Sequence, residues 1–236
     1  MITVLMATYQ GRQYLEQQLD TILAQTVPVK ILISDDGSDD GTREMLDNYA
    51  GWYPEQVVLH HRTEHTGGAA ENFFWLMQEA LKDEKNEYIL FSDQDDVWEN
   101  DKVSVMLHRM KVLEKGLGSA CPILLYSDME VVDEELYEIS PSFASYTHQD
   151  PDRSSFAELL VENQVTGGAS MINRALLMRC AKAPEVCCMH DWWIALTASC
   201  FGIIEFMPRA LSKYRQHGNN VLGAKDAGSF GEMKAR

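Results

Sequence analysis

The fold is decided by a stretch in which an apolar run meets an acidic turn: residues 29–41, VKILISDDGSDDG. The run from Val29 to Ile33 is rich in β-branched residues and predicts a buried strand. Asp and Gly close this strand because both residue types favour turns. Residues 41–49 then predict a helix, so the stretch predicts a strand, an acidic loop and a helix in succession.

The same succession recurs on both sides of this stretch. Apolar runs predict buried strands at residues 2–7, 57–60 and 88–91, and helical spacing predicts helices at residues 14–23 and 70–81. Continuous apolar strands that alternate with helices are typical of a mostly parallel sheet covered on both faces. We therefore expect an α/β protein, a Rossmann-like α/β/α sandwich, whose ligands bind beyond the carboxyl ends of the strands.

The second half of the chain is less regular. The further elements expected there are strands at residues 123–126 and 203–206 and helices that begin near Arg174 and at Asp191. Residues 138–156 are polar and contain Pro141 and Pro151, which predicts a mobile loop or lid. Residues 214–220 predict a polar tail segment.

Composition limits the classes of protein that the chain can belong to. With 236 residues, 45% of them hydrophobic, the chain can bury a full core. A net charge of −16 disfavours nucleic-acid binding, since such a surface repels a phosphate backbone. A small phosphate-bearing ligand stays compatible with this charge if a metal ion or local cations reverse the field.

The cellular compartment is indicated by the cysteines and by the apolar runs. The 5 cysteines form no C-x-x-C pair, which favours a reducing cytoplasm. No apolar run approaches the roughly 18 residues that span a bilayer. Residues 1–7 lack the basic region of a signal peptide. Peripheral contact with the inner face of a membrane stays open.

Acidic clusters lie at the ends of apolar runs, at residues 34–38, 92–96, 126–128 and 190–193. Three of them directly follow predicted strands, so we expect them to meet at one edge of the sheet. Carboxylates crowd together mainly where a divalent cation lies between them and a diphosphate. The order of the clusters along an α/β chain therefore predicts a nucleotide-sugar site.

Each of these clusters also has a simpler interpretation. Asp93 and Asp95 suit Mg²⁺ or Mn²⁺ bound to a diphosphate, but a solvated loop that caps the next helix would look the same. Asp35 and Asp36 can accept hydrogen bonds from a base or ribose, or they can serve only as turn formers and helix caps.

The cluster at residues 190–193 predicts a general base. Asp191 can take a proton from an acceptor hydroxyl, with Trp192 or Trp193 as an apolar platform for a sugar ring. Aromatic packing would desolvate this carboxylate and raise its basicity. The alternative is that Asp191 is an N-cap and that the tryptophans are core. His217 is either a further metal ligand or a surface histidine.

Taken as a set, these strings resemble the family 2 glycosyltransferases of the GT-A fold, and among them the bacterial rhamnosyltransferase-like members. The resemblance covers roughly residues 2–220. It is carried by residues 4–11, by residues 33–42, by Gly67 with Asn72, and by residues 91–98, FSDQDDVW. The Gln-x-x-Arg-Trp segment of processive synthases is absent, so the resemblance implies one sugar added per encounter.

The resemblance also implies roles for individual residues. The implied donor-binding residues are Thr8, Tyr9, Asp35, Asp36, Gly67, Asn72 and Asp93; the acceptor-binding residues are Trp192, Trp193, Gly167 and Gly168; the metal ligands are Asp95 and His217; and the catalytic base is Asp191. His190 stands where many members carry a Glu, which removes a supporting carboxylate.

The implied activity is an inverting, metal-dependent transfer in cell-surface polysaccharide biosynthesis. The donor would be a nucleotide-diphosphate sugar, dTDP-rhamnose or a UDP-hexose, the acceptor a saccharide or lipid-linked chain, and the cofactor Mn²⁺ or Mg²⁺. Residues 1–236 would form one catalytic domain, with a nucleotide-sugar half at about 1–120, an acceptor half at about 121–220 and a tail at 221–236, where truncation stays open. The alternatives are a nucleotidyltransferase and a non-catalytic carbohydrate-binding domain of the same fold.

Overall fold

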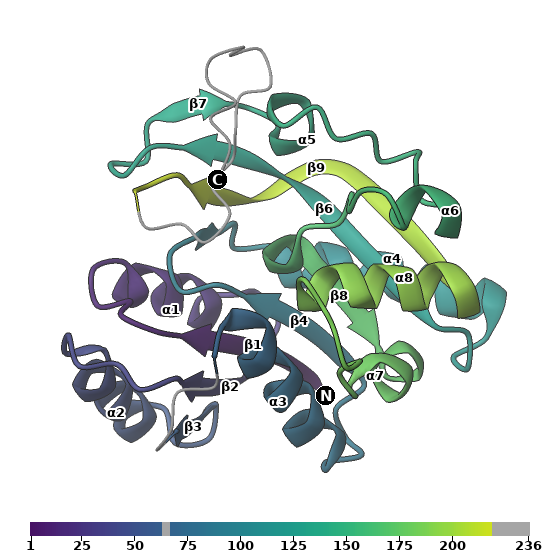
Figure 1. The fold of residues 1–236 in the computed structure, drawn as a ribbon. Helices are drawn as coiled ribbons and strands as arrows, with labels where there is room; N and C mark the ends of the chain where they lie inside the picture. The colour runs from purple at the N-terminus through teal and green to yellow at the C-terminus, as the bar shows by residue number, and fades with distance from the viewer. Residues whose placement is uncertain (63–66, 219–236) are drawn as a thin grey trace.

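A nine-stranded sheet lies at the centre of the computed structural model, which describes residues 1–62 and 67–218 (Figure 1). Its strands are β1 (Ile2–Thr8), β2 (Lys30–Asp35), β3 (Val57–His61), β4 (Tyr88–Ser92), β5 (Val97–Trp98), β6 (Ile123–Val132), β7 (Glu138–Ser140), β8 (Ser170–Asn173) and β9 (Ile203–Arg215). The order is β3-β2-β1-β4-β8-β6-β9-β5, and β7 pairs with β6.

The longest ladders of this sheet are parallel. Strands β3, β2, β1 and β4 run parallel to one another, and β6 runs parallel to β9. The short strand β8 joins these two parts, antiparallel to both β4 and β6. The predicted mostly parallel α/β sheet is thus confirmed, and the sequence missed β8 because its four residues lie between a Gly-Gly turn and a helix.

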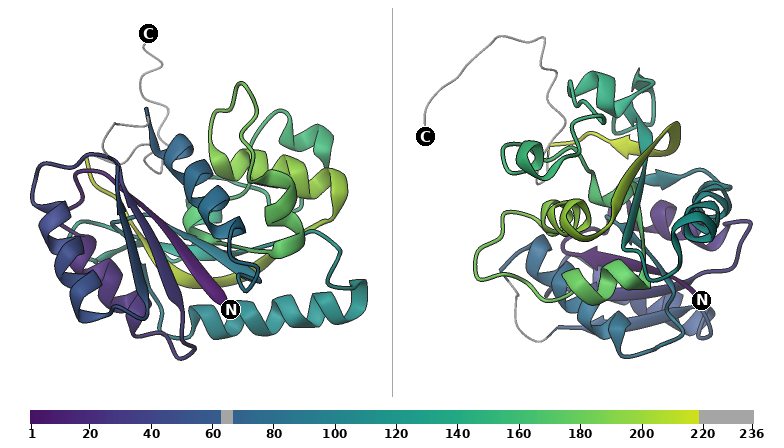
Figure 2. Two further views of the ribbon diagram at one scale, coloured as in Figure 1. Left: turned by 90° about the horizontal axis from the view of Figure 1, so that it is seen from below. Right: turned by 90° about the vertical axis from the view of Figure 1, so that its right-hand side faces the viewer.

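Helices cover both faces of the sheet (Figure 2). They are α1 (Leu15–Leu23), α2 (Thr42–Trp52), α3 (Ala69–Leu81), α4 (Lys102–Leu117), α5 (Phe143–Tyr146), α6 (Phe156–Leu159), α7 (Arg174–Cys180) and α8 (His190–Phe201), with a 3₁₀ turn η1 (Gly167–Ala169). Val4 and Met6 of β1 pack in the core cluster of α1, α2 and α4, whereas Leu5 packs in that of α3, α7 and α8. This alternation is the period of two expected for a strand buried on both faces.

Two expectations for residues 123–156 were wrong. Asp128 lies inside β6 and not after a strand, because β6 continues to Val132 alongside β9. Asp128 accepts hydrogen bonds from Ser142 Oγ (2.6 Å) and Phe143 N (3.0 Å), so this carboxylate caps α5. Residues 138–156 therefore contain β7 and α5 where a loop was predicted.

The predicted polar tail begins inside the sheet. Tyr214 and Arg215 are the last residues of β9 and pair with Val131 and Val132. The sequence did not predict this part of β9, because its side chains are mostly polar. Such residues form a strand here because they pair with β6, and that pairing is not visible in the sequence. The predicted tail at residues 221–236 lies outside the described residues.

The loop after β4 is closed by a short strand that sequence periodicity did not show. Val97 and Trp98 form β5, which pairs antiparallel with Lys213 and Ser212 of β9. The acidic residues 93–96 are therefore fixed at both ends by the sheet. Within residues 1–62 and 67–218, the structure contains no helix with the length and apolar character needed to cross a membrane.

Candidate active site

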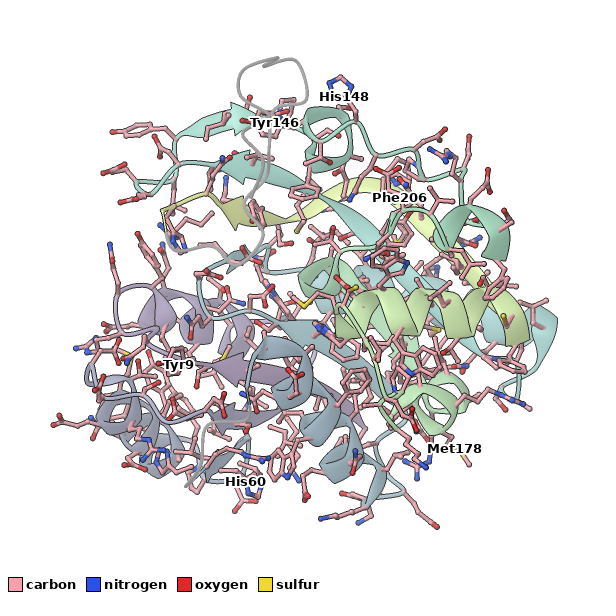
Figure 3. All side chains as sticks on the ribbon, in the orientation of Figure 1. Tyr9, His60, Tyr146, His148, Met178 and Phe206 are labelled. Carbon is pink, nitrogen blue, oxygen red and sulfur yellow. The ribbon has the colours of Figure 1, made fainter. Side chains whose placement is uncertain are left out.

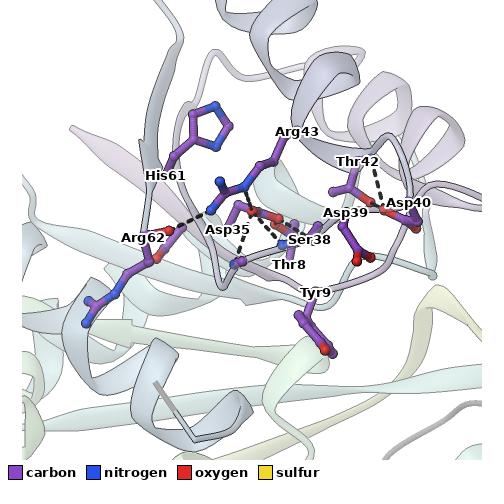
Figure 4. A network of polar contacts seen from close by, with 12 residues as sticks. Thr8, Tyr9, Asp35, Ser38, Asp39, Asp40, Thr42, Arg43, His61 and Arg62 are labelled. Atoms are coloured by element: carbon purple, nitrogen blue, oxygen red, sulfur yellow. Dashed lines mark hydrogen bonds and ion pairs between the residues drawn. The ribbon is translucent and has the colours of Figure 1, made fainter. Parts of the chain in front are cut away.

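The end of β1 and the end of β2 form one polar network (Figure 4). Asp35 is fully buried and accepts hydrogen bonds from Thr8 Oγ1 (3.1 Å), Ser38 Oγ (2.5 Å) and Arg43 Nε (2.7 Å). Burial by itself would raise the pKa of Asp35, but the hydrogen bonds from Ser38, Arg43 and Thr8 outweigh burial and hold the pKa below its usual value. The carboxylate therefore stays ionised and fixes the shape of the turn.

Asp36 and Tyr9 flank this network. The Asp36 N–H donates to Thr8 O (2.9 Å), which joins the ends of the two strands, and Asp36 itself is buried. Tyr9 is 48% exposed at the carboxyl end of β1 (Figure 3). Its backbone exchanges two hydrogen bonds of 2.9 Å with the side chain of Gln94, which ties the end of β1 to the acidic loop after β4.

Gly67 and Asn72 lie at the start of α3. Asn72 is buried, and its Nδ2 donates to Ser34 O (2.9 Å), so it braces the helix against the end of β2. Gly67 is exposed and has a φ of 105°, a left-handed conformation that favours glycine. Asn72 thus contacts the strand that ends in Asp35, and the donor-binding role of Gly67 and Asn72 stays a prediction.

The acidic loop carries carboxylates that burial makes hard to ionise. Burial, and then the charges of Asp95 and Asp191, raise the pKa of Asp93. Burial, and then Asp95 and Asp93, raise that of Asp96. The buried Lys102 opposes both shifts, while burial lowers its own pKa. A cation bound nearby would favour the ionised form of both carboxylates, because an opposite charge lowers the pKa of a carboxyl group.

The two predicted metal ligands lie in contact although 122 residues separate them. His217 Nε2 is 2.8 Å from Asp95 Oδ2, and the His217 ring lies 4.9 Å from that of Tyr14. Arg215 Nε donates to Asp95 O (2.9 Å), so the end of β9 holds the loop in place. A carboxylate oxygen and an imidazole nitrogen are both suitable ligands for Mn²⁺.

The chemistry of this pair fits a cation that the substrate helps to bind. In the part of the chain that the structure describes, no group of three or more His, Cys, Asp or Glu side chains is arranged to hold a metal ion. Cations that bind nucleotides use one or two carboxylates and complete their coordination with phosphate oxygens and water. If Asp95 and His217 bind a cation, as predicted, they supply two ligands and leave the remaining positions to a diphosphate.

Asp191 lies in the first turn of α8, and backbone and side-chain donors surround its carboxylate. Oδ1 accepts from Trp192 N (2.6 Å) and Asn163 Nδ2 (3.2 Å), and Oδ2 accepts from Gly167 N (3.1 Å). Burial raises the pKa of Asp191 to about 6 despite these bonds. A carboxylate with this pKa is ionised at neutral pH and basic enough to accept a proton from a reacting hydroxyl.

The predicted acceptor residues surround Asp191 in different ways. Trp192 and Trp193 are half-buried, and their Nε1 atoms donate to Leu159 O (2.5 Å) and Cys180 O (3.1 Å). Gly167 and Gly168 are buried in η1, where a methyl group on Gly167 would lie 2.8 Å from His190 Nε2. Both glycines thus allow the neighbouring side chains to pack closely against the turn. That Trp192, Trp193 and the two glycines contact an acceptor stays a prediction.

Three side chains at this site were missed by sequence reasoning: Asn163, Lys102 and Arg215. Asn163 lies in an irregular loop and Arg215 in the unpredicted end of β9, so no local pattern identified them. Lys102 had a signal, because it is the first cation after the acidic residues 93–101. A basic residue that close to a carboxylate cluster is a natural counter-charge.

Comparison with known families and sequences shows which proteins the chain is similar to. The family model described as Glycosyl transferase family 2 matches residues 3–179. The dTDP-rhamnosyl transferase RfbG of Shigella flexneri is 29% identical over 230 residues, which cover 93% of this chain and 74% of that protein. The putative teichuronic acid biosynthesis glycosyltransferase TuaG of Bacillus subtilis (strain 168) is 31% identical over 177 residues, 73% of this chain and 66% of that protein.

Solved structures with the same fold are longer than this chain. Staphylococcus aureus TarS 1-349 in complex with UDP-GlcNAc has a TM-score of 0.65 at 15% identity, over 93% of this chain and 59% of that chain. Mannosyltransferase PcManGT from Pyrobaculum calidifontis, in complex with GDP-Man and Mn²⁺, has a TM-score of 0.68 at 18% identity, over 92% of this chain and 57% of that chain. At these identities the likeness establishes the GT-A fold.

Proposed function

The chain belongs to glycosyltransferase family 2, and from this premise we propose that it transfers one sugar from a nucleotide-diphosphate donor to an acceptor hydroxyl. One observation carries the proposal. The Asp191 carboxylate, whose pKa burial raises to about 6, is bonded to the same Gly-Gly turn that packs against Asp93 of the acidic loop. A base and a nucleotide-binding loop that share one turn are arranged for group transfer between two substrates.

The donor would bind at the carboxyl ends of β1, β2 and β4. The nucleoside would lie against Thr8, Tyr9 and the turn that Asp35 holds, with Asp93 on the ribose. Gly67 and Asn72 would border the same site. Dinucleotides and nucleotides bind at this edge in open α/β sheets. The UDP-GlcNAc and GDP-Man complexes of the structural neighbours support a nucleotide-sugar donor of this class.

A divalent cation would be held by Asp95 and His217. When bound, it would neutralise the charge that develops on the leaving diphosphate. The contact between Asp95 Oδ2 and His217 Nε2 supports this assignment, as does the Mn²⁺ in the mannosyltransferase structure.

The chemistry at Asp191 would be a single displacement. The carboxylate removes the proton of the acceptor hydroxyl while that oxygen bonds to the anomeric carbon. The bond from this carbon to the diphosphate oxygen breaks on the opposite face, so the anomeric configuration inverts. The transition state resembles an oxocarbenium ion, as in glycoside hydrolysis. Trp192, Trp193 and the turn at Gly167 and Gly168 would form the acceptor side.

The substrates are proposed from the relatives that the chain resembles. The dTDP-rhamnosyl transferase supports dTDP-rhamnose as donor, with UDP-hexoses as the competing class. The teichuronic acid protein supports an acceptor in cell-surface polysaccharide biosynthesis, a saccharide or a lipid-linked chain. We place the reaction in the cytoplasm, because the five cysteines are free thiols. Residues 1–120 and 121–220 would be the donor and acceptor halves.

A donor panel tests this proposal. The purified chain is incubated with dTDP-rhamnose, UDP-glucose, UDP-GlcNAc and GDP-mannose, each with Mn²⁺, with Mg²⁺ and with a chelator, and release of the nucleoside diphosphate is measured. We expect release with one donor class, only with metal, and faster when a saccharide acceptor is added. Equal release with the chelator would refute the role of the cation, and no release from any donor would refute the proposed transfer.

A further inference from the structure

A lysine is buried in the middle of the acidic site. Lys102 is the first residue of α4, and its exposed fraction is 0%. An ammonium group without contact to water is costly unless hydrogen bonds and opposite charges compensate it. The contacts of Lys102 therefore indicate what the buried amine does for the protein.

The amine of Lys102 joins three elements that are distant in sequence. Nζ donates to Gly168 O of η1 (2.7 Å) and to Ser212 Oγ of β9 (3.3 Å). It also lies 4.0 Å from the centre of the Trp98 ring in β5, within the range of a cation–π interaction. Both hydrogen bonds use the amine as a donor, so they hold the turn in either protonation state.

The turn that Lys102 holds contacts both halves of the site. On one side, Gly167 N donates to Asp191 Oδ2 (3.1 Å). On the other side, a methyl group on Gly168 would lie 3.1 Å from Asp93 Oδ2 and 3.2 Å from Asp96 Oδ2. A shift of the turn would thus change the distance between the base and the donor-binding carboxylates.

We infer that Lys102 is a positioning residue: through its hydrogen bond to Gly168 O, it fixes the 3₁₀ turn that sets Asp191 against Asp93. Lys102 is enclosed by protein, so it acts on the reaction through the residues around it and not by contact with a substrate. The inference rests on the proposed role of Asp191 as the base. Small errors in the placement of a reacting group lower the rate strongly, which is why a fixed turn would matter here.

The decisive experiment measures the titration of Asp191 itself. The carboxyl carbons of aspartate are labelled with ¹³C, the Asp191 signal is assigned with Asp191→Asn, and its midpoint is followed by NMR against pH. The variants are Lys102→Met, which removes the amine at similar volume, and Ser212→Ala, which keeps the amine and its charge but removes one acceptor. Lys213→Met is the matched control, since it breaks the Lys213–Glu130 pair (2.8 Å) on the same strand as Ser212.

We expect Lys102→Met to raise the Asp191 midpoint by roughly half to one pH unit, because the bond from Gly167 N weakens and the carboxylate loses a donor. Its kcat should fall on the order of 10- to 100-fold through misplacement of the base. Ser212→Ala should shift the midpoint in the same direction, which reports the position of the turn because the charge of Lys102 is retained. Lys213→Met should leave both quantities unchanged.

The other titratable groups that interact with Asp191 do not explain a raised midpoint. Lys102 lowers the pKa of Asp93, so Lys102→Met makes Asp93 harder to ionise; a neutral Asp93 would lower the Asp191 midpoint, and Ser212→Ala keeps Lys102 in place. Cys187 is retained in every variant. His190 stays neutral above pH 5, because burial lowers its pKa to about 3. A midpoint unchanged in both Lys102→Met and Ser212→Ala would overturn the inference. If Lys102→Met does not fold, Ser212→Ala decides alone. A wild-type chain that transfers no sugar would refute the proposed function, while the titration would still test the positioning.

Discussion

The hydrogen bond from Asn163 to Asp191 gives a quantitative test of the proposed base. Asn163 Nδ2 lies 3.2 Å from Asp191 Oδ1, the longest of the three hydrogen bonds to this carboxylate. Asn163→Ala removes this donor, and because the donor favours the ionised form, its loss raises the pKa of Asp191. A bond to a charged group contributes about 1.5 kcal/mol at the low end, which corresponds to about one pH unit.

The measurement is kcat for sugar transfer between pH 5 and 9. The wild-type rate should fall below pH 6, because burial raises the pKa of Asp191 to about 6 and the base must be ionised. For Asn163→Ala this limb should lie near pH 7, so at pH 6.5 the variant should be about threefold slower and at pH 8.5 about equal to wild type.

The matched control is the neighbouring Gln164→Ala. Gln164 Oε1 accepts a hydrogen bond from Asp150 N (2.8 Å), and its side chain makes no hydrogen bond to Asp191 within the described structure. This variant loosens the same loop and should leave the acid limb at pH 6. An acid limb that stays in place in Asn163→Ala, or that moves equally in Gln164→Ala, would refute the assignment of the limb to Asp191.

Two further predictions concern the metal site and a buried histidine. Asp95→Ala and His217→Ala should each weaken Mn²⁺ binding in the presence of nucleoside diphosphate by at least about tenfold, since removing a residue that only supports a metal ligand already has that effect. Calorimetric titration measures the Mn²⁺ affinity, and an unchanged affinity in both variants would contradict the assignment. His190 is stacked on Phe73 at 4.0 Å, and burial lowers its pKa from 6.5 to about 3. Its neutral form is favoured by folding, so this contribution to stability is complete above pH 6.5 and is lost as the pH falls toward 3, by up to about 1.4 kcal/mol per unit. Chemical denaturation at several pH values should therefore show a shallower loss in His190→Phe than in wild type, and identical slopes would contradict the prediction.

The strands of the first half could be predicted from sequence because each is buried on both faces. Val4, Leu5 and Met6 face alternate cores, so β1 is a continuous apolar run that needs no tertiary information to be recognised. β9 is different. Its last residues, Tyr214 and Arg215, form a strand because they pair with β6. A polar segment whose strand conformation depends on pairing with a distant segment cannot be recognised from its own sequence.

The site was partly predictable for the same reason. Acidic residues that follow buried strands must gather at one sheet edge, which identified Asp35 and Asp93 from their positions in the chain. The contact of Asp95 with His217 was suggested by family resemblance, and the residues themselves left it open. Asn163 donates directly to Asp191, and Lys102 donates to the turn at Gly167 and Gly168. Both contacts join residues distant in sequence, so they become visible only in the folded structure.

The most direct test of the account compares donor binding and sugar transfer in Asp191→Asn. Calorimetry with Mn²⁺ and the nucleoside diphosphate of the active donor gives the affinity, and the transfer assay at pH 8 gives kcat. Because the role proposed for Asp191 concerns the acceptor and not the donor, we predict an affinity within about twofold of wild type and a kcat lowered by about 10² to 10⁴. A variant that retains the wild-type kcat, or one that loses donor binding and transfer together, would contradict the role of Asp191 as the base.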